Sequence, residues 1–162
     1  MLIRRANTSD TGSILNLLSQ VLEIHAWIRP DVFISGTTKY SEDDLARMYP
    51  DDTRPIYVAV DDVGAVRGYA FCQVKPSNPR PPMMVPHKIL YVDDICVDAY
   101  SRRSHVGLAL FDHVKQEARR LGCDTVTLNV WEGNDAALKF YKSMGMKTRS
   151  RTMEYGLNRK ED

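Results

Sequence analysis

Long apolar runs are missing from the sequence. None approaches the roughly 18–20 consecutive apolar residues that a membrane-spanning helix requires. The first residues, MLIRRANTSD, also lack the apolar stretch of a secretory signal peptide. We therefore expect a cytoplasmic protein that has no membrane partner.

Cysteine is scarce, and its spacing fits neither a disulfide framework nor a metal site. Cys72, Cys96 and Cys123 are odd in number, widely separated and each set in an apolar context, so we expect reduced core thiols. The sequence has no Cys-x-x-Cys and no His-Glu-x-x-His pattern, so we expect no metal. An acyl-accepting role for Cys96 is disfavoured, because no neighbouring pattern would activate its thiol.

An excess of charge of either sign is missing as well. The 22 basic and 21 acidic residues give a net charge of +1, which provides no global field for a nucleic acid, and we expect none as a partner. With 162 residues, 43% of them hydrophobic, the chain is long enough to bury about 68–70% of its unfolded surface. The sequence therefore predicts a single domain over residues 1–162.

Hydrophobic periodicity and turn residues predict three strands and two helices in the first half. These elements are a strand at 1–5, a helix from the polar residues 7–10 to about residue 26, a short helix ending before residue 50, and a hairpin of strands 56–60 and 66–74. Ser41 and Asp44 resemble the capping box of the short helix. Five prolines between Val74 and Lys88 favour a long, exposed hairpin loop.

Strands and helices alternate in the second half. The expected elements are strands at 89–97, 125–131 and 147–157, and helices at 106–121 and 134–144. Gly122 and Gly145 follow the two helices, as glycine commonly does at a helix end. The whole order, β-α-α-β-β-β-α-β-α-β, predicts an α/β protein with a mixed sheet. Its strand–helix–strand unit requires a parallel pair with a right-handed crossover.

The segment from Asp98 to Leu110 joins a strand to the start of a helix. Backbone N–H groups at a helix N-terminus have no intrahelical partners, and together with the helix dipole they favour phosphate. Arg102 and Arg103 would add positive charge there. An ordinary strand-to-helix turn with solvated arginines explains the same spacing about equally well.

This loop resembles the acyl-coenzyme A loop of the GNAT family of N-acetyltransferases, which is written Arg/Gln-x-x-Gly-x-Gly/Ala. Here it reads Arg102-Arg103-Ser104-His105-Val106-Gly107, so His105 stands where the first glycine is usual. Glycine allows close approach of backbone to phosphate, so we expect His105 to hold its side chain away. Residues 91–97 and 129–146 are similar to the family's fourth strand and to its fifth strand with the following helix.

The resemblance implies the GNAT fold and a transferase that moves an acetyl group from acetyl-CoA to a primary amine by direct transfer in a ternary complex. Backbone groups of the strand before the loop would pair with the pantetheine arm, and one N–H would hold the thioester oxygen. The cofactor-binding residues that it implies are Ile95, Cys96, Val97, Arg102, Arg103, Ser104, His105, Val106, Gly107, Leu108, Asn134 and Tyr141.

Two of these residues also have a purely structural interpretation. Tyr141, which the resemblance makes the acid that protonates the departing thiolate, could instead be an aromatic residue packed against the sheet. Asn134 could be the N-cap of its helix, and its side chain is not expected to cap and to bind cofactor at once.

Asp93 occupies the position where several members of the family carry a glutamate that takes a proton from the amine. Because Asp is one methylene shorter, a water relay is the expected route. The alternative is that Asp93 caps a loop or pairs with a basic residue. Its neighbour Asp94 must point to the opposite face if the strand is regular.

The acceptor site is the least defined part. His25, Trp27 and Arg29 lie where related enzymes wall the acceptor, although a histidine on an apolar helical face is more often a core residue. The resemblance implies a small-molecule or peptide amine as acceptor, and a homodimer. A competing hypothesis is a non-catalytic module of the same fold that binds acyl-CoA as a sensor or partner domain.

Overall fold

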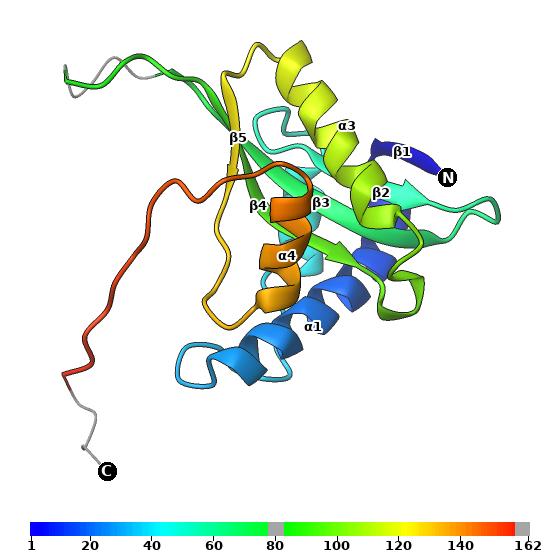
Figure 1. Cartoon of the computed structure of the whole chain (residues 1–162). Coiled ribbons are helices and arrows are strands. Elements are labelled where there is room, and N and C mark those ends of the chain that lie inside the picture. Colours follow the sequence, from blue (N-terminus) through cyan, green and yellow to red (C-terminus); the bar gives the residue numbers. More distant parts are fainter. Residues whose placement is uncertain (78–82, 158–162) are drawn as a thin grey trace.

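The computed structural model describes residues 1–77 and 83–157. Its centre is a mixed sheet of five strands in the order β1-β2-β3-β4-β5 (Figure 1). The strands are β1 (Leu2–Arg5), β2 (Ile56–Val60), β3 (Val66–Lys75), β4 (Ile89–Val97) and β5 (Thr125–Leu128). Neighbouring strands are antiparallel except β4 and β5, which are parallel, as the predicted crossover requires.

Helices cover both faces of the sheet. On one face, α1 (Thr11–Ile28) and α2 (Glu42–Met48) bury Ile14, Leu18 and Leu45 against alternate residues of β2 and β3. On the other face, α3 (Val106–Arg120) buries Leu110 and Val114. The last helix, α4 (Asp135–Ser143), lies between α1 and α3 (Figure 1). Alternation along β2 supplies both cores, so this strand is buried throughout.

Local signals explain where the helices begin. Asn7 and Asp10 form a capping box at the short 3₁₀ helix η1 (Thr8–Asp10), which leads directly into α1. Ser41 and Asp44 form the predicted capping box of α2, which is confirmed. Asp10 is only 4% exposed, and its carboxylate accepts two hydrogen bonds from Arg4, at 2.7 and 2.9 Å. The first strand is thereby tied to the first helix.

The long loop between β3 and β4 is confirmed as a hairpin loop, since the strands pair antiparallel up to Lys75 and Ile89. Three of its five prolines, Pro79, Pro81 and Pro82, lie outside the described residues. In the ranges that are described, no helix has the length and apolar character needed to cross a membrane.

Two strand predictions need correction. The fifth strand ends at Leu128, three residues before the expected Trp131. The strand expected over residues 147–157 does not form, so the observed order stops at α4. All residues of this segment are exposed, and it runs away from the sheet (Figure 1). Its alternating pattern suits a strand, but a strand also requires a neighbouring backbone, which alternation along the chain does not specify.

Candidate active site

The site begins at an irregularity in β4. This strand pairs with β3 as far as Val97, but it pairs with β5 only as far as Val92, opposite Leu128. A β-bulge lies at the same place, because Phe71 is opposite Asp94 while Cys72 is opposite Val92. From Asp93 onward β4 therefore has backbone groups on its β5 side that β5 does not take up. The predicted cofactor residues Ile95, Cys96 and Val97 lie on this open stretch.

The loop after β4 leads to the N-terminus of α3. Gln20 of α1 holds this loop by donating to the Asp98 carboxylate and accepting from the Ala99 N–H, both at 3.1 Å. The short 3₁₀ helix η2 (Ala99–Ser101) follows, and the Ser104 hydroxyl donates to the Ser101 carbonyl oxygen. The loop is thus anchored to α1 before α3 begins.

His105 is the N-cap of α3, and its side chain makes no capping hydrogen bond. Its φ of 64° lies in the left-handed region that favours glycine, as does the φ of 63° at Arg103. The His105 side chain is exposed. The first-turn N–H groups of Val106, Gly107 and Leu108 precede the first intrahelical bond, which runs from Ala109 N–H to the His105 carbonyl.

The side chains of Arg102, Arg103, Ser104 and Leu108 are exposed, whereas Val106 is buried. Gly107 lies against α4, because a Cβ added there would be 3.2 Å from the Phe140 ring. The predicted anion-binding turn thus combines open N–H groups, solvated cations and a close helix contact.

Tyr141 of α4 is 8% exposed and packs beside Phe111 and Phe140, with ring centroids 6.0 and 5.2 Å away. Burial raises the pKa of its hydroxyl, and the neighbouring Asp94 carboxylate raises it further. No described residue forms a hydrogen bond with this hydroxyl. The packing interpretation therefore holds, and the protonated phenol also lies near the open stretch of β4.

Asn134 caps α4, since its side-chain oxygen accepts from the Ala137 N–H at 3.3 Å. The N-cap interpretation is confirmed. The same oxygen is thus already engaged within the protein.

Asp93 is held by two residues of the loop that precedes α2. The Tyr40 hydroxyl donates to its carboxylate at 2.6 Å, and the Lys39 ammonium forms an ion pair with it at 2.9 Å. The side chain remains 25% exposed. Asp93 is thus a paired carboxylate that solvent can still reach.

Asp94 is directed to the same side as Asp93, which corrects the expectation of opposite faces. Its carboxylate accepts from the Tyr69 hydroxyl at 2.8 Å, and Tyr69 belongs to the core beneath α1. The bulge at Asp93 breaks the strict alternation of a regular strand and explains this arrangement. Burial raises the pKa of Asp94 to about 6, despite the Tyr69 hydrogen bond and the Lys39 charge.

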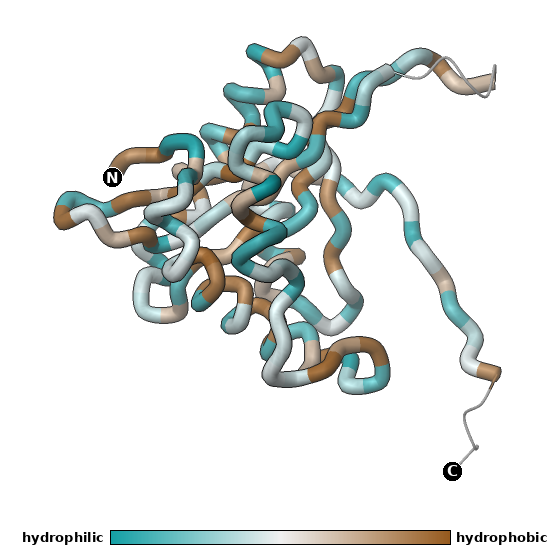
Figure 2. The backbone as a smooth tube through the Cα atoms, turned by 180° about the vertical axis from the view of Figure 1, so that it is seen from behind, coloured by the Kyte–Doolittle hydropathy of each residue, from teal (hydrophilic) through white to brown (hydrophobic). Residues whose placement is uncertain are grey.

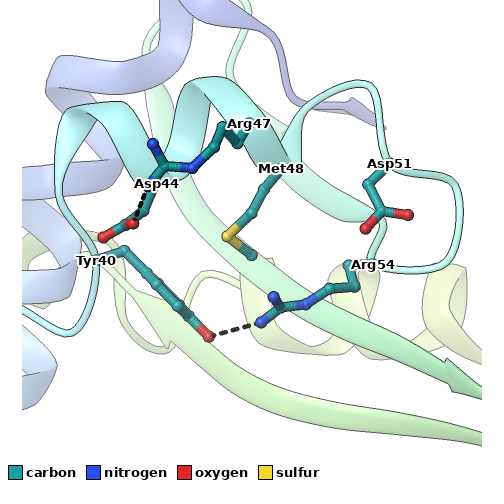
Figure 3. Close-up of a pocket in the computed structure, with 6 residues that line it drawn as sticks. All are labelled: Tyr40, Asp44, Arg47, Met48, Asp51 and Arg54. Carbon is teal, nitrogen blue, oxygen red and sulfur yellow. Dashed lines mark hydrogen bonds and ion pairs between the residues drawn. The ribbon is translucent and has the colours of Figure 1, made fainter.

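Tyr40 also borders a cavity of about 210 Å³. Figure 3 shows its ring between α2 and the chain that leads into β2, with its hydroxyl directed toward the Arg54 guanidinium, 3.4 Å away. The cavity is lined by Tyr40, Asp44, Arg47, Met48, Asp51 and Arg54. Arg47 is already paired with Asp44 at 2.6 Å. The Tyr40 hydroxyl therefore links this cavity to the carboxylate of Asp93.

The predicted acceptor residues separate into two groups. His25 contacts the Phe33 ring at 5.2 Å, and Phe33 contacts Trp131 at 5.3 Å. Arg29 lies over the same Trp131 ring, at 5.4 Å. Arg29 thus contacts the chain that follows β5 directly and His25 does so through Phe33, whereas Trp27 is 84% exposed and has no described ring contact with this cluster. Burial, assisted by Lys39, lowers the pKa of His25, so the ring is neutral at pH 7.

All three cysteines are free thiols. Burial raises the pKa of Cys96 to about 12, and that of Cys72 to the same level. A thiol that stays protonated at pH 7 is a poor nucleophile, and this agrees with the expectation that Cys96 is inert. In the parts of the chain that the structure describes, no group of three or more His, Cys, Asp or Glu residues is arranged to hold a metal ion.

Sequence reasoning missed Lys39, Tyr40 and Tyr69 as parts of this site. Lys39 and Tyr40 lie more than fifty residues before Asp93, and they come next to it only when the loop folds over β4. Tyr69 is placed beside Asp94 by the pairing of β3 with β4. A Lys-Tyr pair in a loop has no spacing signal, so only a long-range pairing could have indicated it.

Comparison with known proteins gives a consistent assignment. The sequence model of the acetyltransferase (GNAT) family matches residues 20–146. The tetramutant of the BH1408 protein from Bacillus halodurans superposes with a TM-score of 0.91 at 28% identity, covering 97% of this chain and 100% of that chain. An acetyltransferase of Trypanosoma brucei superposes with a TM-score of 0.69 at 22% identity, covering 96% of this chain and 99% of that chain. Glucosamine-6-phosphate N-acetyltransferase from Arabidopsis thaliana superposes with a TM-score of 0.69 at 18% identity, covering 97% of this chain and 98% of that chain. No curated protein sequence matches.

Proposed function

Because the chain belongs to the acetyltransferase (GNAT) family, we propose that it transfers an acetyl group from acetyl-CoA directly to a primary amine within a ternary complex. The observation that carries this proposal is the parting of β4 from β5 at Asp93. It leaves backbone donors and acceptors open beside a buried, protonated Tyr141 and a solvent-accessible carboxylate. An open stretch of strand backbone and two groups able to move protons thus lie together.

The residues present fit acetyl-CoA. The backbone of Ile95, Cys96 and Val97 offers alternating donors and acceptors of the kind that an amide-containing pantetheine arm needs. The open N–H groups at the start of α3 suit the pyrophosphate, and Arg102 and Arg103 add charge. The bound cosubstrate supplies an acetyl thioester, whose carbonyl oxygen a β4 N–H would stabilise.

A base is required because the acceptor must attack as a neutral amine. Alkylamines with a pKa of about 10.4 are mostly protonated at pH 7. Asp93 is the candidate base, acting through water, because it is partly exposed and because Tyr40 and Lys39 hold it in one orientation. Asp94 lies close enough for the charge of Asp93 to contribute to the raised pKa of the Asp94 carboxyl.

Tyr141 is the candidate acid. Its raised pKa keeps the proton on the phenol until a thiolate develops nearby. Tyr141→Phe should reduce turnover by about 10²–10⁴-fold while the affinity for acetyl-CoA stays within about twofold, because the ring packing is retained. The matched control is Tyr155→Phe, since Tyr155 is 86% exposed in the C-terminal segment. Unchanged turnover in Tyr141→Phe would remove Tyr141 from the acid role.

The acceptor would enter near the cluster of His25, Phe33 and Trp131, at the end of α1. Aromatic rings and a neutral imidazole form a wall that suits the carbon skeleton of an amine. We therefore propose a small-molecule or peptide amine as acceptor.

The first experiment is calorimetric titration with acetyl-CoA and, in parallel, with coenzyme A that lacks its 3′-phosphate. Saturable binding that weakens without the phosphate supports the cofactor site. Release of free thiol is then measured with polyamines, amino acids, aminoglycosides and peptide N-termini. Absence of binding at millimolar acetyl-CoA would contradict the proposal.

The alternative is an acyl-CoA-binding sensor of the same fold. His105 in the left-handed conformation favours it, because a side chain stands where the family usually has glycine. Saturable binding without thiol release from any of these amines would favour the sensor, whereas amine-dependent thiol release would exclude it.

A further inference from the structure

The loop between α1 and α2 carries a lysine at the candidate base. This loop spans residues 29–41 and lies on the side of the molecule that Figure 2 shows. Within it, the Lys39 ammonium is 2.9 Å from the Asp93 carboxylate. Asp93 is also the residue at which β4 parts from β5. A primary amine of the protein itself thus occupies the place where an acceptor amine must meet its base.

The backbone of this loop is held on both sides of Lys39. On the N-terminal side, the Gly36 N–H donates to the Glu23 carboxylate of α1, at 2.7 Å. On the C-terminal side, the Tyr40 ring stacks on Phe71, with 5.2 Å between the ring centroids. The Lys39 side chain is 44% exposed, and a lysine amine sits on a flexible four-carbon stem. The loop therefore presents the amine at the site, while its stem can still carry it toward a neighbouring group.

The charge of Lys39 also reaches other groups of the site. Burial lowers the pKa of His25, and the Lys39 charge lowers it further. The same charge opposes the rise that burial causes in the pKa of Asp94. His25 contacts Phe33, in the cluster where the acceptor is proposed to enter. Lys39 therefore lies near the proposed acceptor entry as well as near the two adjacent carboxyls.

The ion pair between Lys39 and Asp93 is not needed to orient the carboxylate. The Tyr40 hydroxyl already holds it by a hydrogen bond of 2.6 Å. An ion pair that is partly exposed contributes little to stability, because water screens both charges. The amine can thus leave Asp93 at little cost, and the carboxylate keeps its orientation when it does.

We propose that Lys39 is a self-acetylation site, whose amine accepts the acetyl group of acetyl-CoA bound to the same chain. This inference rests on the proposed function, because it uses the same cosubstrate, base and acid. Asp93 takes one proton from the Lys39 ammonium, and the neutral nitrogen then bonds to the thioester carbon. The C–S bond breaks, and the coenzyme A thiolate takes the proton of Tyr141.

Protons and charges balance in this reaction. The nitrogen of Lys39 loses two protons: one passes from Asp93 to solvent, and the other returns through water to the Tyr141 oxygen. The products are an amide on Lys39, free coenzyme A and one released proton. An amide carries no charge, so the acetylated side chain can no longer form an ion pair with Asp93.

The test is incubation of the full chain with acetyl-CoA alone, its acetyl group labelled with deuterium, followed by peptide mass spectrometry. Lys39 should acquire the labelled acetyl group, and the label separates it from acetyl groups acquired during expression. Transfer within one chain requires a rate per chain that stays constant when protein is raised about 50-fold at saturating acetyl-CoA. A rate that rises with protein concentration would overturn transfer within one chain.

Lys115 is the matched control. It pairs with Asp112 of its own helix at 2.7 Å and is 33% exposed, so it is similar to Lys39 in burial and in partner. Acetylation without catalysis should modify both lysines to a similar extent, whereas the proposed site should favour Lys39 by at least about 10²-fold. Equal labelling of the two lysines would overturn the proposal.

Two variants test the base and the position. Asp93→Asn keeps an oxygen for the Tyr40 hydroxyl, and it should slow the labelling of Lys39 by at least about 10²-fold while that of Lys115 is unchanged. Lys39→Arg keeps the cation beside Asp93, and the total label should fall to that of the remaining lysines. Undiminished labelling of Lys39 in Asp93→Asn would contradict the proposed base.

Failure of this inference can be distinguished from failure of the proposed function. Release of free thiol with external amines is measured on the same preparation. Amine-dependent release without labelling of Lys39 would overturn self-acetylation and leave the proposed function in place. Absence of acetyl-CoA binding would contradict both.

Discussion

The carboxyl of Asp94 allows a quantitative test of the electrostatics of the site. In the folded protein burial raises its pKa from 3.8 to about 6. A difference of about two pKa units corresponds to about 3 kcal/mol of unfavourable ionisation at high pH. The side chain keeps some contact with solvent, so we expect about 1–2 kcal/mol after screening.

Asp94→Asn removes this ionisation and keeps an oxygen that can accept from the Tyr69 hydroxyl. At pH 8 the wild-type carboxyl is ionised in both states and burial penalises the folded one, so the variant should be more stable by about 1–2 kcal/mol. Below pH 4 the carboxyl is protonated in both states, so the gain should vanish. The loss of wild-type stability should therefore develop as pH rises from about 4 through 6.

Urea titrations of both proteins between pH 4 and pH 8 measure this difference. Asp52→Asn is the matched control, since it removes the same charge from a side chain that is 95% exposed, and it should change stability by less than about 0.5 kcal/mol. A gain that is the same at pH 4 and pH 8, or a loss at both, would refute the reasoning. Turnover in the same variant shows whether Asp94 takes part in proton transfer.

Three further substitutions test the fold. Gly68→Ala should lower the free energy of unfolding by about 1–3 kcal/mol, because the new Cβ would lie 2.7 Å from the Cys96 carbonyl oxygen. Its control in urea titration is Gly12→Ala, because a Cβ at Gly12 would have no neighbour within 4 Å. Asp10→Ala should lower the free energy of unfolding by about 3 kcal/mol at pH 7, because it leaves the Arg4 guanidinium without its carboxylate partner. Burial alone would raise the pKa of Asp10, but its hydrogen bonds hold that pKa below 3.8. The stability lost in Asp10→Ala should therefore shrink as the pH falls below about 4. An equal loss of stability at pH 2 would contradict the ion pair. His105→Gly should stabilise the folded protein by no more than about 1 kcal/mol. The substitution relieves backbone strain at a φ of 64°, but glycine also gives the unfolded chain more conformational freedom. A loss of stability above about 1 kcal/mol would indicate that the His105 side chain makes a stabilising contact.

Much of the fold could be predicted because its signals are local. The bounds of β4 agree residue for residue with the prediction, and α3 ends one residue early, at Arg120. Caps, glycines and hydrophobic period act over a few residues, so they can be recognised along the chain. The first helix continues to Ile28, two residues past the expected end.

The candidate site could be predicted only in part. Tyr141, Asp93 and the turn before α3 were identified because they lie within a family motif that is continuous in sequence. Lys39 and Tyr40, which fix the orientation of Asp93, belong to no motif and become neighbours through loop folding. The side on which Asp94 lies was predicted wrongly, because a bulge arises from the pairing of two strands.

By itself, the sequence determined the order of the elements, the starts of the helices, the family and the residues of the turn that suits phosphate. Each of these depends on interactions between residues near one another along the chain. The tertiary structure alone decided where β4 leaves β5, which groups hold the two adjacent carboxyls, and that residues 147–157 do not join the sheet of their own chain. Those outcomes depend on register and on contacts between distant segments, whose free energy becomes defined only when the chain has folded.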